Sequence, residues 1–162
     1  MIWILLKDDG DESDVTVQGI GPKVVTVQEL QDLATSSDTP VYWAGNRKGL
    51  RLELTKTDSG RVYVRYVPAN VAPGDTRPNF LAVATYPESN GYFAVRVAGQ
   101  EKGASAKQIP GGGLLVSKKK ATSVHFSYPG AAYQVEVFDP TPDRARRLVL
   151  AGDVQRVRHR VR

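Results

Sequence analysis

His125, Ser127 and Glu136 are the residues whose types and spacing come nearest to a catalytic group. The chain has only two histidines, His125 and His159, so acid-base chemistry has few places to occur. If residues 124–128 and 133–137 pair as a hairpin, His125 lies beside Ser127 and opposite Glu136. A serine, a histidine and a carboxylate on one surface outline a nucleophilic triad.

Strand geometry argues against such a triad. Neighbouring residues on one face of a strand project in parallel, and no Gly-x-Ser-x-Gly turn lifts Ser127 towards a substrate. We therefore predict no catalytic residue, and expect His125, Ser127 and Glu136 to form a polar surface site. A hydrolase that uses His125 or an unrecognised carboxylate is the alternative.

The C-terminal arginines are the candidate anion-binding residues. Val157, His159 and Val161 alternate with them, so an extended strand would place every arginine on one side. Such a row suits an anionic polymer or lipid surface. No aromatic residue is interleaved to stack on bases, which argues against nucleic acid. The residues are Arg156, Arg158, Arg160 and Arg162.

Composition limits the other chemistry. The 162 residues suit one domain, and the absence of cysteine excludes disulfides, thiol catalysis and cysteine-based zinc sites. Gly111–Gly113 is not followed by the Lys-Ser or Lys-Thr of a phosphate-binding loop. The acidic run between Asp8 and Asp14 lacks the calcium-loop pattern. We predict no metal and no cofactor.

The N-terminus predicts a location. Met1–Leu6 is apolar and is followed by Lys7 and an acidic run, as at the downstream end of a membrane anchor. Six residues are too few to span a bilayer, which takes about 20. We expect the remnant of an anchor, with an apolar first strand or a disordered end as alternatives.

Two hairpins are the clearest structural signals. Around Asp58-Ser59-Gly60, pairing outwards matches Leu54 with Val64 and Glu53 with Arg65, which separates apolar from polar side chains. Around residues 129–132, the same procedure matches Val124 with Val137, Phe126 with Val135, Ser127 with Gln134 and His125 with Glu136.

Three helices complete the prediction. Thr26 and Glu29 form a capping box that begins the first, and residues 91–98 form a shorter one after Ser89 or Asn90. Thr141 caps the third, with Pro142 at its first position and Gly152 at its end. We predict an α+β fold: a mixed, mainly antiparallel sheet of about six to seven strands, with two or three helices on one face.

The expected organisation has three parts. Residues 1–23 are the truncated anchor and an acidic linker, residues 24–155 are a single α+β domain, and residues 156–162 are a basic tail.

Four strings carry a resemblance to known proteins: Pro40-Val41-Tyr42-Trp43-Ala44-Gly45, Tyr86-Pro87, Pro110-Gly111-Gly112-Gly113 and Tyr133-Gln134-Val135-Glu136-Val137-Phe138-Asp139-Pro140. With them, residues 24–155 resemble an uncharacterised actinobacterial family whose members often start with a membrane helix or lipoprotein signal. The resemblance implies attachment to the cell membrane and no particular activity.

We therefore expect a non-catalytic, extracytoplasmic binding or protein-interaction module. Its partner would be a protein or cell-envelope ligand, and the membrane tether would lie at the N-terminus. The remaining alternative is a cytoplasmic module that binds an anionic polymer through the C-terminal arginines.

Overall fold

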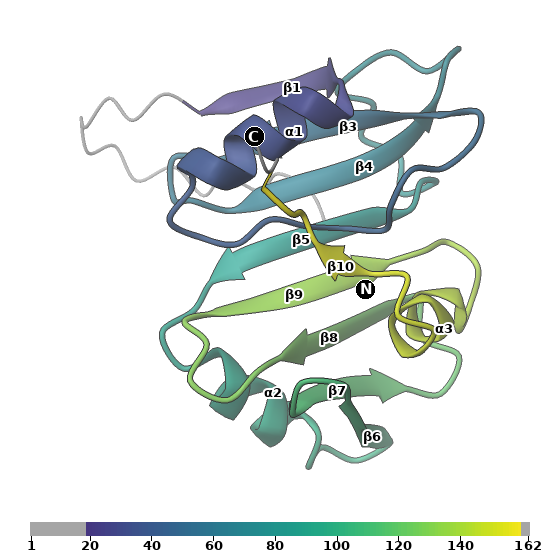
Figure 1. Ribbon diagram of the computed structural model, residues 1–162. Coiled ribbons are helices and arrows are strands. Elements are labelled where there is room, and N and C mark those ends of the chain that lie inside the picture. Colours follow the sequence, from purple (N-terminus) through teal and green to yellow (C-terminus); the bar gives the residue numbers. More distant parts are fainter. Residues whose placement is uncertain (1–18, 160–162) are drawn as a thin grey trace.

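A computed structural model describes residues 19–159 and shows an α+β fold built on one large antiparallel sheet (Figure 1). The eight strands of this sheet lie in the order β1-β3-β4-β5-β9-β8-β7-β6, and a separate two-stranded sheet joins β2 to β10. The elements are β1 (Ile20–Val25), α1 (Val27–Ser36), β2 (Tyr42–Trp43), β3 (Leu50–Lys56), β4 (Val62–Pro68), β5 (Ala82–Pro87), α2 (Gly91–Ala98), β6 (Ala104–Ile109), β7 (Gly113–Lys118), β8 (Ser123–Ser127), β9 (Tyr133–Phe138), α3 (Arg144–Leu150) and β10 (Gln155–Arg156). The fold class is confirmed, whereas the main sheet has more strands than expected.

The predicted register of both hairpins is confirmed. Leu54 pairs with Val64 and Glu53 with Arg65 across β3 and β4. Val124 pairs with Val137, Phe126 with Val135 and His125 with Glu136 across β8 and β9. Because each pairing keeps apolar side chains together, a one-residue slip would bury charge and expose the core.

Strand alternation gives the large sheet two different faces. The inner face carries an apolar row that continues from strand to strand (Leu54, Val64, Val83, Val137 and Val124). The outer face carries the residues between them (Glu53, Arg65, Ala82, Glu136 and His125). The main hydrophobic core lies on the inner face, where Leu30 of α1 and Leu148 of α3 join it.

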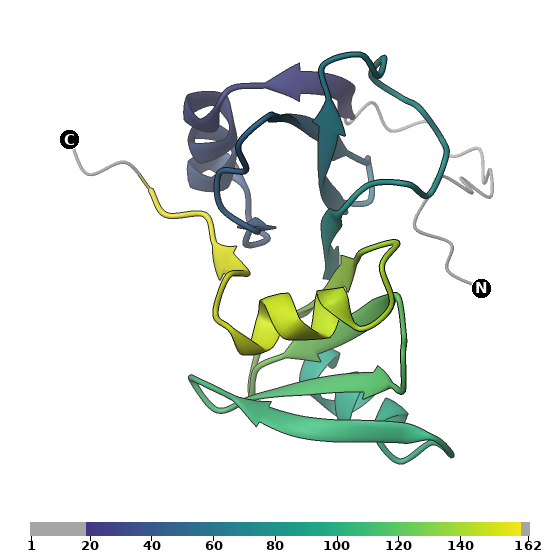
Figure 2. The ribbon, with the colours of Figure 1, turned by 90° about the vertical axis from the view of Figure 1, so that its right-hand side faces the viewer.

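The expectation that all helices lie on one face is wrong. Helices α1 and α3 lie on the inner face, but α2 lies behind the sheet (Figures 1 and 2). In α2, a Cβ built on Gly91 would lie 2.1 Å from the carbonyl oxygen of Tyr133, and one on Gly99 would lie 3.2 Å from Val116 Cγ2. Because α2 has a glycine at each end, it can approach the outer face closely. The periodicity of its apolar residues does not predict this.

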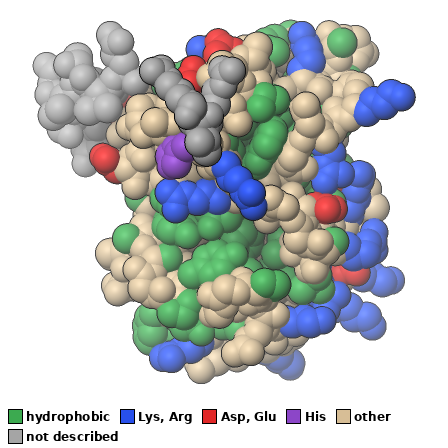
Figure 3. All heavy atoms as spheres, viewed as in Figure 1, with side chains coloured by type: hydrophobic (Ala, Val, Ile, Leu, Met, Phe, Trp, Pro, Cys, Tyr) green, Lys and Arg blue, Asp and Glu red, His purple; other side chains and the backbone are tan. Residues whose placement is uncertain are grey.

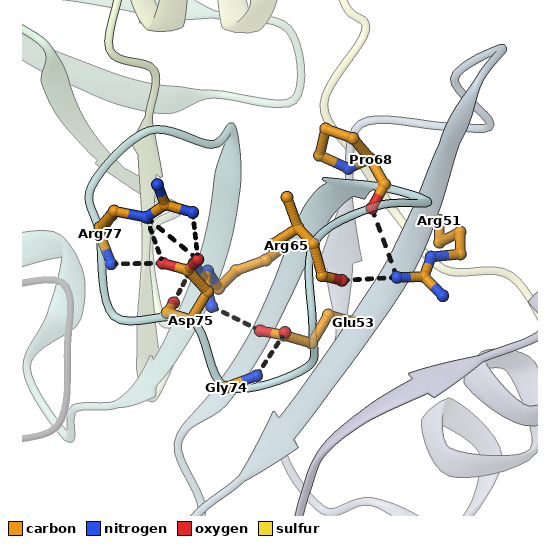
Figure 4. Close-up of polar contacts among 8 residues, drawn as sticks. Arg51, Glu53, Arg65, Pro68, Gly74, Asp75 and Arg77 are labelled. Atoms are coloured by element: carbon orange, nitrogen blue, oxygen red, sulfur yellow. Dashed lines mark hydrogen bonds and ion pairs between the residues drawn. The ribbon is translucent and has the colours of Figure 1, made fainter.

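A loop between β4 and β5 covers another part of the outer face. Its Gly74 donates a backbone hydrogen bond of 2.9 Å to Glu53, and its Asp75 carbonyl accepts one of 2.7 Å from Arg65 (Figure 4). The guanidinium of Arg65 also lies 5.3 Å from the centre of the Phe80 ring. These contacts hold the loop against β3 and β4.

Two boundaries differ from the expected organisation. Strand β1 begins at Ile20 and pairs with β3, so residues 20–23 belong to the sheet rather than to a linker. Arg156 belongs to β10, which pairs with β2 rather than starting a tail. Both strands depend on distant partners, which composition does not reveal.

The helix ends agree with expectation in one case and differ in another. Thr26 and Glu29 form the complete capping box of α1. Helix α3 instead begins at Arg144 after Asp143, whose φ of 67° is left-handed, so neither Thr141 nor Pro142 starts it. The backbone N–H of Asp143 donates to the carbonyl of Ala121 at 2.9 Å, a tertiary contact that displaces the expected cap.

Candidate functional site

A polar cluster around Glu136 lies on the outer face of the sheet. The Glu136 carboxylate is buried and accepts a hydrogen bond of 2.6 Å from the Tyr86 hydroxyl and a second from the Ser123 hydroxyl. His125 Nε2 lies 4.0 Å from Glu136 Oε1. Three strands therefore meet at one carboxylate.

The predicted trio is brought together only in part. His125 and Glu136 are neighbours, but Ser127 is fully buried and donates a hydrogen bond of 2.7 Å to the carbonyl of Tyr133. Ser123 occupies the place beside Glu136 instead. Its position two residues before His125 on a strand was the available signal, because residues i and i+2 share a face.

The hydrogen bonds of this cluster are those of a structural network. Burial, and then the charge of Glu136, raise the pKa of the Tyr86 hydroxyl, which keeps it protonated as a donor. Burial lowers the pKa of His125, although the charge of Glu136 opposes this, and its buried Nδ1 has no hydrogen-bond partner among residues 19–159. The Ser123 hydroxyl donates to Glu136 rather than to the imidazole. The described residues thus provide no serine-histidine hydrogen bond of the kind that activates a nucleophile.

An open groove of about 830 Å³ lies on the inner face. One side is formed by residues at the ends of β6 and β8, and the other by the segment that follows α3. Figure 3 shows hydrophobic side chains gathered below Lys and Arg side chains on this side of the molecule. The groove residues are Tyr42, Ile109, Pro110, Phe126, Tyr128, Val149, Gly152, Val154, Gln155, Arg156, Val157, Arg158 and His159.

Aromatic packing fixes one wall of the groove. Phe126 lies edge-on to both Tyr42 and Tyr128, with ring centres 5.6 Å and 6.0 Å apart. The Tyr42 hydroxyl is 3.1 Å from that of Tyr133, and burial followed by this hydrogen bond raises the pKa of Tyr42. The wall is therefore aromatic and uncharged, as suits an apolar contact surface.

The described C-terminal arginines form the rim of this groove. Arg156 and Arg158 are exposed while Val157 between them is buried, as the alternating pattern predicts. Neither guanidinium makes a hydrogen bond or ion pair with any residue in the range 19–159. Arg160 and Arg162 lie outside the described residues.

His159 differs from the alternating pattern because it is exposed. Its Nδ1 lies 3.0 Å from the Thr35 hydroxyl, which itself donates to the carbonyl of Gln31. The tautomer of the imidazole decides which of these two atoms donates. This bond ties the end of the arginine segment to α1.

Two other kinds of functional feature are absent from the described part of the chain. Residues 19–159 contain no group of three or more His, Asp or Glu side chains placed to hold a metal ion. None of the helices in that range has the length and apolar character needed to cross a membrane.

The chain matches no family model, no curated protein and no solved structure. The resemblance to actinobacterial proteins consequently stays a prediction, and the case for a function depends on the groove and the polar cluster themselves.

Proposed function

We propose that this protein is a non-catalytic binding domain whose groove takes a protein segment that combines apolar side chains with carboxylates. The observation that carries the proposal is the pairing of an aromatic, apolar wall with two exposed arginines that lack partners in the described chain. An apolar surface gains free energy when covered, and free guanidinium groups are available to pair with carboxylates.

The composition of the groove favours a protein partner. Tyrosine, phenylalanine and arginine are enriched at the centres of protein interfaces, and Tyr128, Phe126 and Arg156 all line this surface. The groove is open to solvent, so a segment of a protein partner can reach it.

The polar cluster supports the non-catalytic part of the proposal. Its carboxylate already accepts hydrogen bonds from Tyr86 and Ser123, and no serine among residues 19–159 makes a hydrogen bond with His125. Hydrolysis at His125 is the competing proposal, and it predicts that replacing His125 by glutamine abolishes a measurable ester or peptide hydrolysis.

We also propose that the domain works at the extracytoplasmic face of the cell membrane, tethered through its N-terminal segment. The support is the apolar run Met1–Leu6 followed by acidic residues. Cell fractionation, followed by protease treatment of intact cells, tests this. Recovery of a protected, soluble protein would contradict it and favour the cytoplasmic alternative.

A peptide-binding experiment tests the groove directly. The probe is a fluorescein-labelled peptide in which leucine and phenylalanine residues precede a run of Asp and Glu, and the readout is fluorescence anisotropy. We expect saturable binding that weakens by at least about tenfold in R156E/R158E, because both favourable charges become repulsive. We expect a several-fold loss in V154S, which removes apolar contact from the groove wall.

The matched control is K23E/K102E, which makes the same change in net charge at exposed lysines outside the groove. We expect it to bind as the wild type does. Equal weakening in this control would show attraction by net charge alone and would refute a specific groove. A peptide with lysines in place of its acids should not bind.

A further inference from the structure

We infer that a second, basic pocket between the β7–β8 turn and the start of α3 binds a small, multiply charged anion of the phosphate class. The pocket has a volume of about 680 Å³, within the range of small-molecule sites. It is lined by Gly103, Ser105, Ser117, Lys118, Lys119, Lys120, Pro142, Asp143 and Arg146. It shares no lining residue with the aromatic groove, so this inference is independent of the proposed function.

The charges of the pocket are unbalanced. Four of its lining side chains are cationic and one, Asp143, is anionic. The Asp143 carboxylate lies 3.6 Å from Arg147, and Lys118 lies 3.6 Å from Glu101 in an exposed pair. The remaining three cations, Lys119, Lys120 and Arg146, have no hydrogen-bond or ion-pair partner among residues 19–159.

Arg146 is the most informative of these cations. Its side chain is half-buried, yet its guanidinium has no acceptor within the described chain. Partial removal from water without a partner costs free energy, which a bound anion would recover. A guanidinium also presents donors in a planar fork that matches two oxygens of one phosphate group.

The cations lie near one another because a hydrogen bond joins the β7–β8 turn to the loop before α3. The β7–β8 turn contains Lys120 with a φ of 54°, and the loop before α3 contains Asp143 with a φ of 67°. They are the only non-glycine residues with positive φ in the range 19–159. The hydrogen bond from Asp143 N–H to the Ala121 carbonyl joins the two turns directly. Figure 2 shows α3 lying against the strands at this end of the sheet.

Uncharged donors complete the pocket. Ser105 and Ser117 line it, and the Ser105 hydroxyl donates to the Ser117 carbonyl at 3.3 Å. The Ser117 hydroxyl makes no hydrogen bond with the described chain, so it is free to contact an anion. Figure 3 shows Lys and Arg side chains gathered along the edge of the molecule where α3 lies.

The lining also narrows the ligand class. No aromatic side chain lines the pocket, so stacked bases would find no platform there. A phosphate group is shared by soluble metabolites and by lipid headgroups, and the experiment below separates these two sources.

The test is calorimetric titration of the full chain with inorganic pyrophosphate at low ionic strength. We expect saturable binding that weakens by at least about tenfold in R146Q and in K120N, since each removes a cation that faces the anion. Asparagine is chosen at position 120 because it tolerates the left-handed backbone of Lys120. Melting temperatures equal to that of the wild type establish that both variants are folded.

The control is R156Q/R158Q, which alters the rim of the groove and should leave pyrophosphate binding unchanged. Vesicles with and without phosphatidic acid form the lipid arm, in which R146Q binding is again compared with wild type. Loss of binding by R146Q supports the inference in either arm. Loss with pyrophosphate identifies a soluble phosphate compound as the ligand, and loss with the vesicles identifies a lipid headgroup. It is overturned if neither probe saturates, if R146Q binds as the wild type does, or if the groove variant loses as much affinity as R146Q.

Discussion

Glu53 of β3 and Arg65 of β4 form a buried ion pair in which Arg65 Nη1 lies 2.6 Å from Glu53 Oε1 (Figure 4). Only 1% of Glu53 and 5% of Arg65 is exposed. The other carboxylate oxygen accepts the backbone N–H of Gly74, and the other guanidinium nitrogen donates to the Asp75 carbonyl. One pair therefore joins two strands to the loop that covers them.

Glu53→Ala should be among the most destabilising single changes in this chain. It leaves the Arg65 charge buried without a counterion and removes the acceptor of Gly74, so we expect a loss of about 3–5 kcal/mol in the free energy of unfolding. Urea unfolding followed by circular dichroism measures the difference.

The nearby pair of Asp75 and Arg77 provides the matched control. The Arg77 guanidinium is largely exposed, although the hydrogen bonds that the side chain and then the backbone N–H of Arg77 donate hold the pKa of Asp75 at about 2. We expect Arg77→Ala to leave the unfolding midpoint almost unchanged, because water replaces the lost partner. If the two variants were equally destabilised, burial would not be what makes the first pair important.

Gly91→Ala should destabilise the protein, although alanine normally favours a helix over glycine by about 1 kcal/mol. The added Cβ would lie 2.1 Å from the Tyr133 carbonyl oxygen, so α2 would have to move away from β9. We expect a lower melting temperature and a loss of more than about 2 kcal/mol. Gly45→Ala is the comparison, since that glycine has a positive φ but no atom within 4 Å of the added group. A stabilised G91A protein would contradict the close packing of α2.

The hairpins were predictable because their information is local. Leu54, Val64, Val124 and Val137 alternate with polar residues on both sides of a turn, and the turn sets the register. The capping box of α1 is similarly contained within four residues that begin at Thr26.

What escaped prediction depends on contacts between distant segments. The side of the sheet that α2 covers follows from its glycines meeting Tyr133 and Val116, and neither partner is near α2 in the sequence. Ser127 was misplaced because its true partner is a backbone carbonyl rather than a side chain. Lys120 and Arg146 come to one pocket where the Asp143 N–H donates a hydrogen bond to the Ala121 carbonyl.

Thr26→Ala should cost about 1 kcal/mol of stability, because the hydroxyl accepts the Glu29 N–H at 3.2 Å and would leave it without an acceptor from the cap. In return, the Glu29 carboxylate accepts a hydrogen bond of 2.7 Å from the Thr26 N–H. Glu29→Gln keeps an acceptor at that position, so we expect a smaller change in the chemical unfolding midpoint. A loss in Glu29→Gln as large as that in Thr26→Ala would contradict this expectation and show that the charge of Glu29 also stabilises the helix start.

His125 should make the protein less stable as the pH falls below about 6.5. Burial holds the pKa of the folded imidazole below its ordinary value of 6.5, and Glu136 only partly offsets this. Between the two pKa values the unfolded chain binds a proton that the folded protein does not, so the free energy of unfolding decreases as the pH is lowered. The unpartnered Nδ1 agrees with this direction, because its N–H would lack an acceptor after protonation.

Urea unfolding of the wild type and His125→Gln at several pH values from 7.5 to 5 tests this dependence. We expect the pH dependence in this range to be reduced in H125Q, which cannot titrate, and to persist in His159→Gln, which removes only the other histidine. Proton NMR of the imidazole C–H resonances would show His125 titrating below its ordinary range. If the free energy of unfolding of H125Q changed with pH as steeply as that of the wild type, His125 would not be the group responsible. The pH dependence would then come from other titratable groups of the fold.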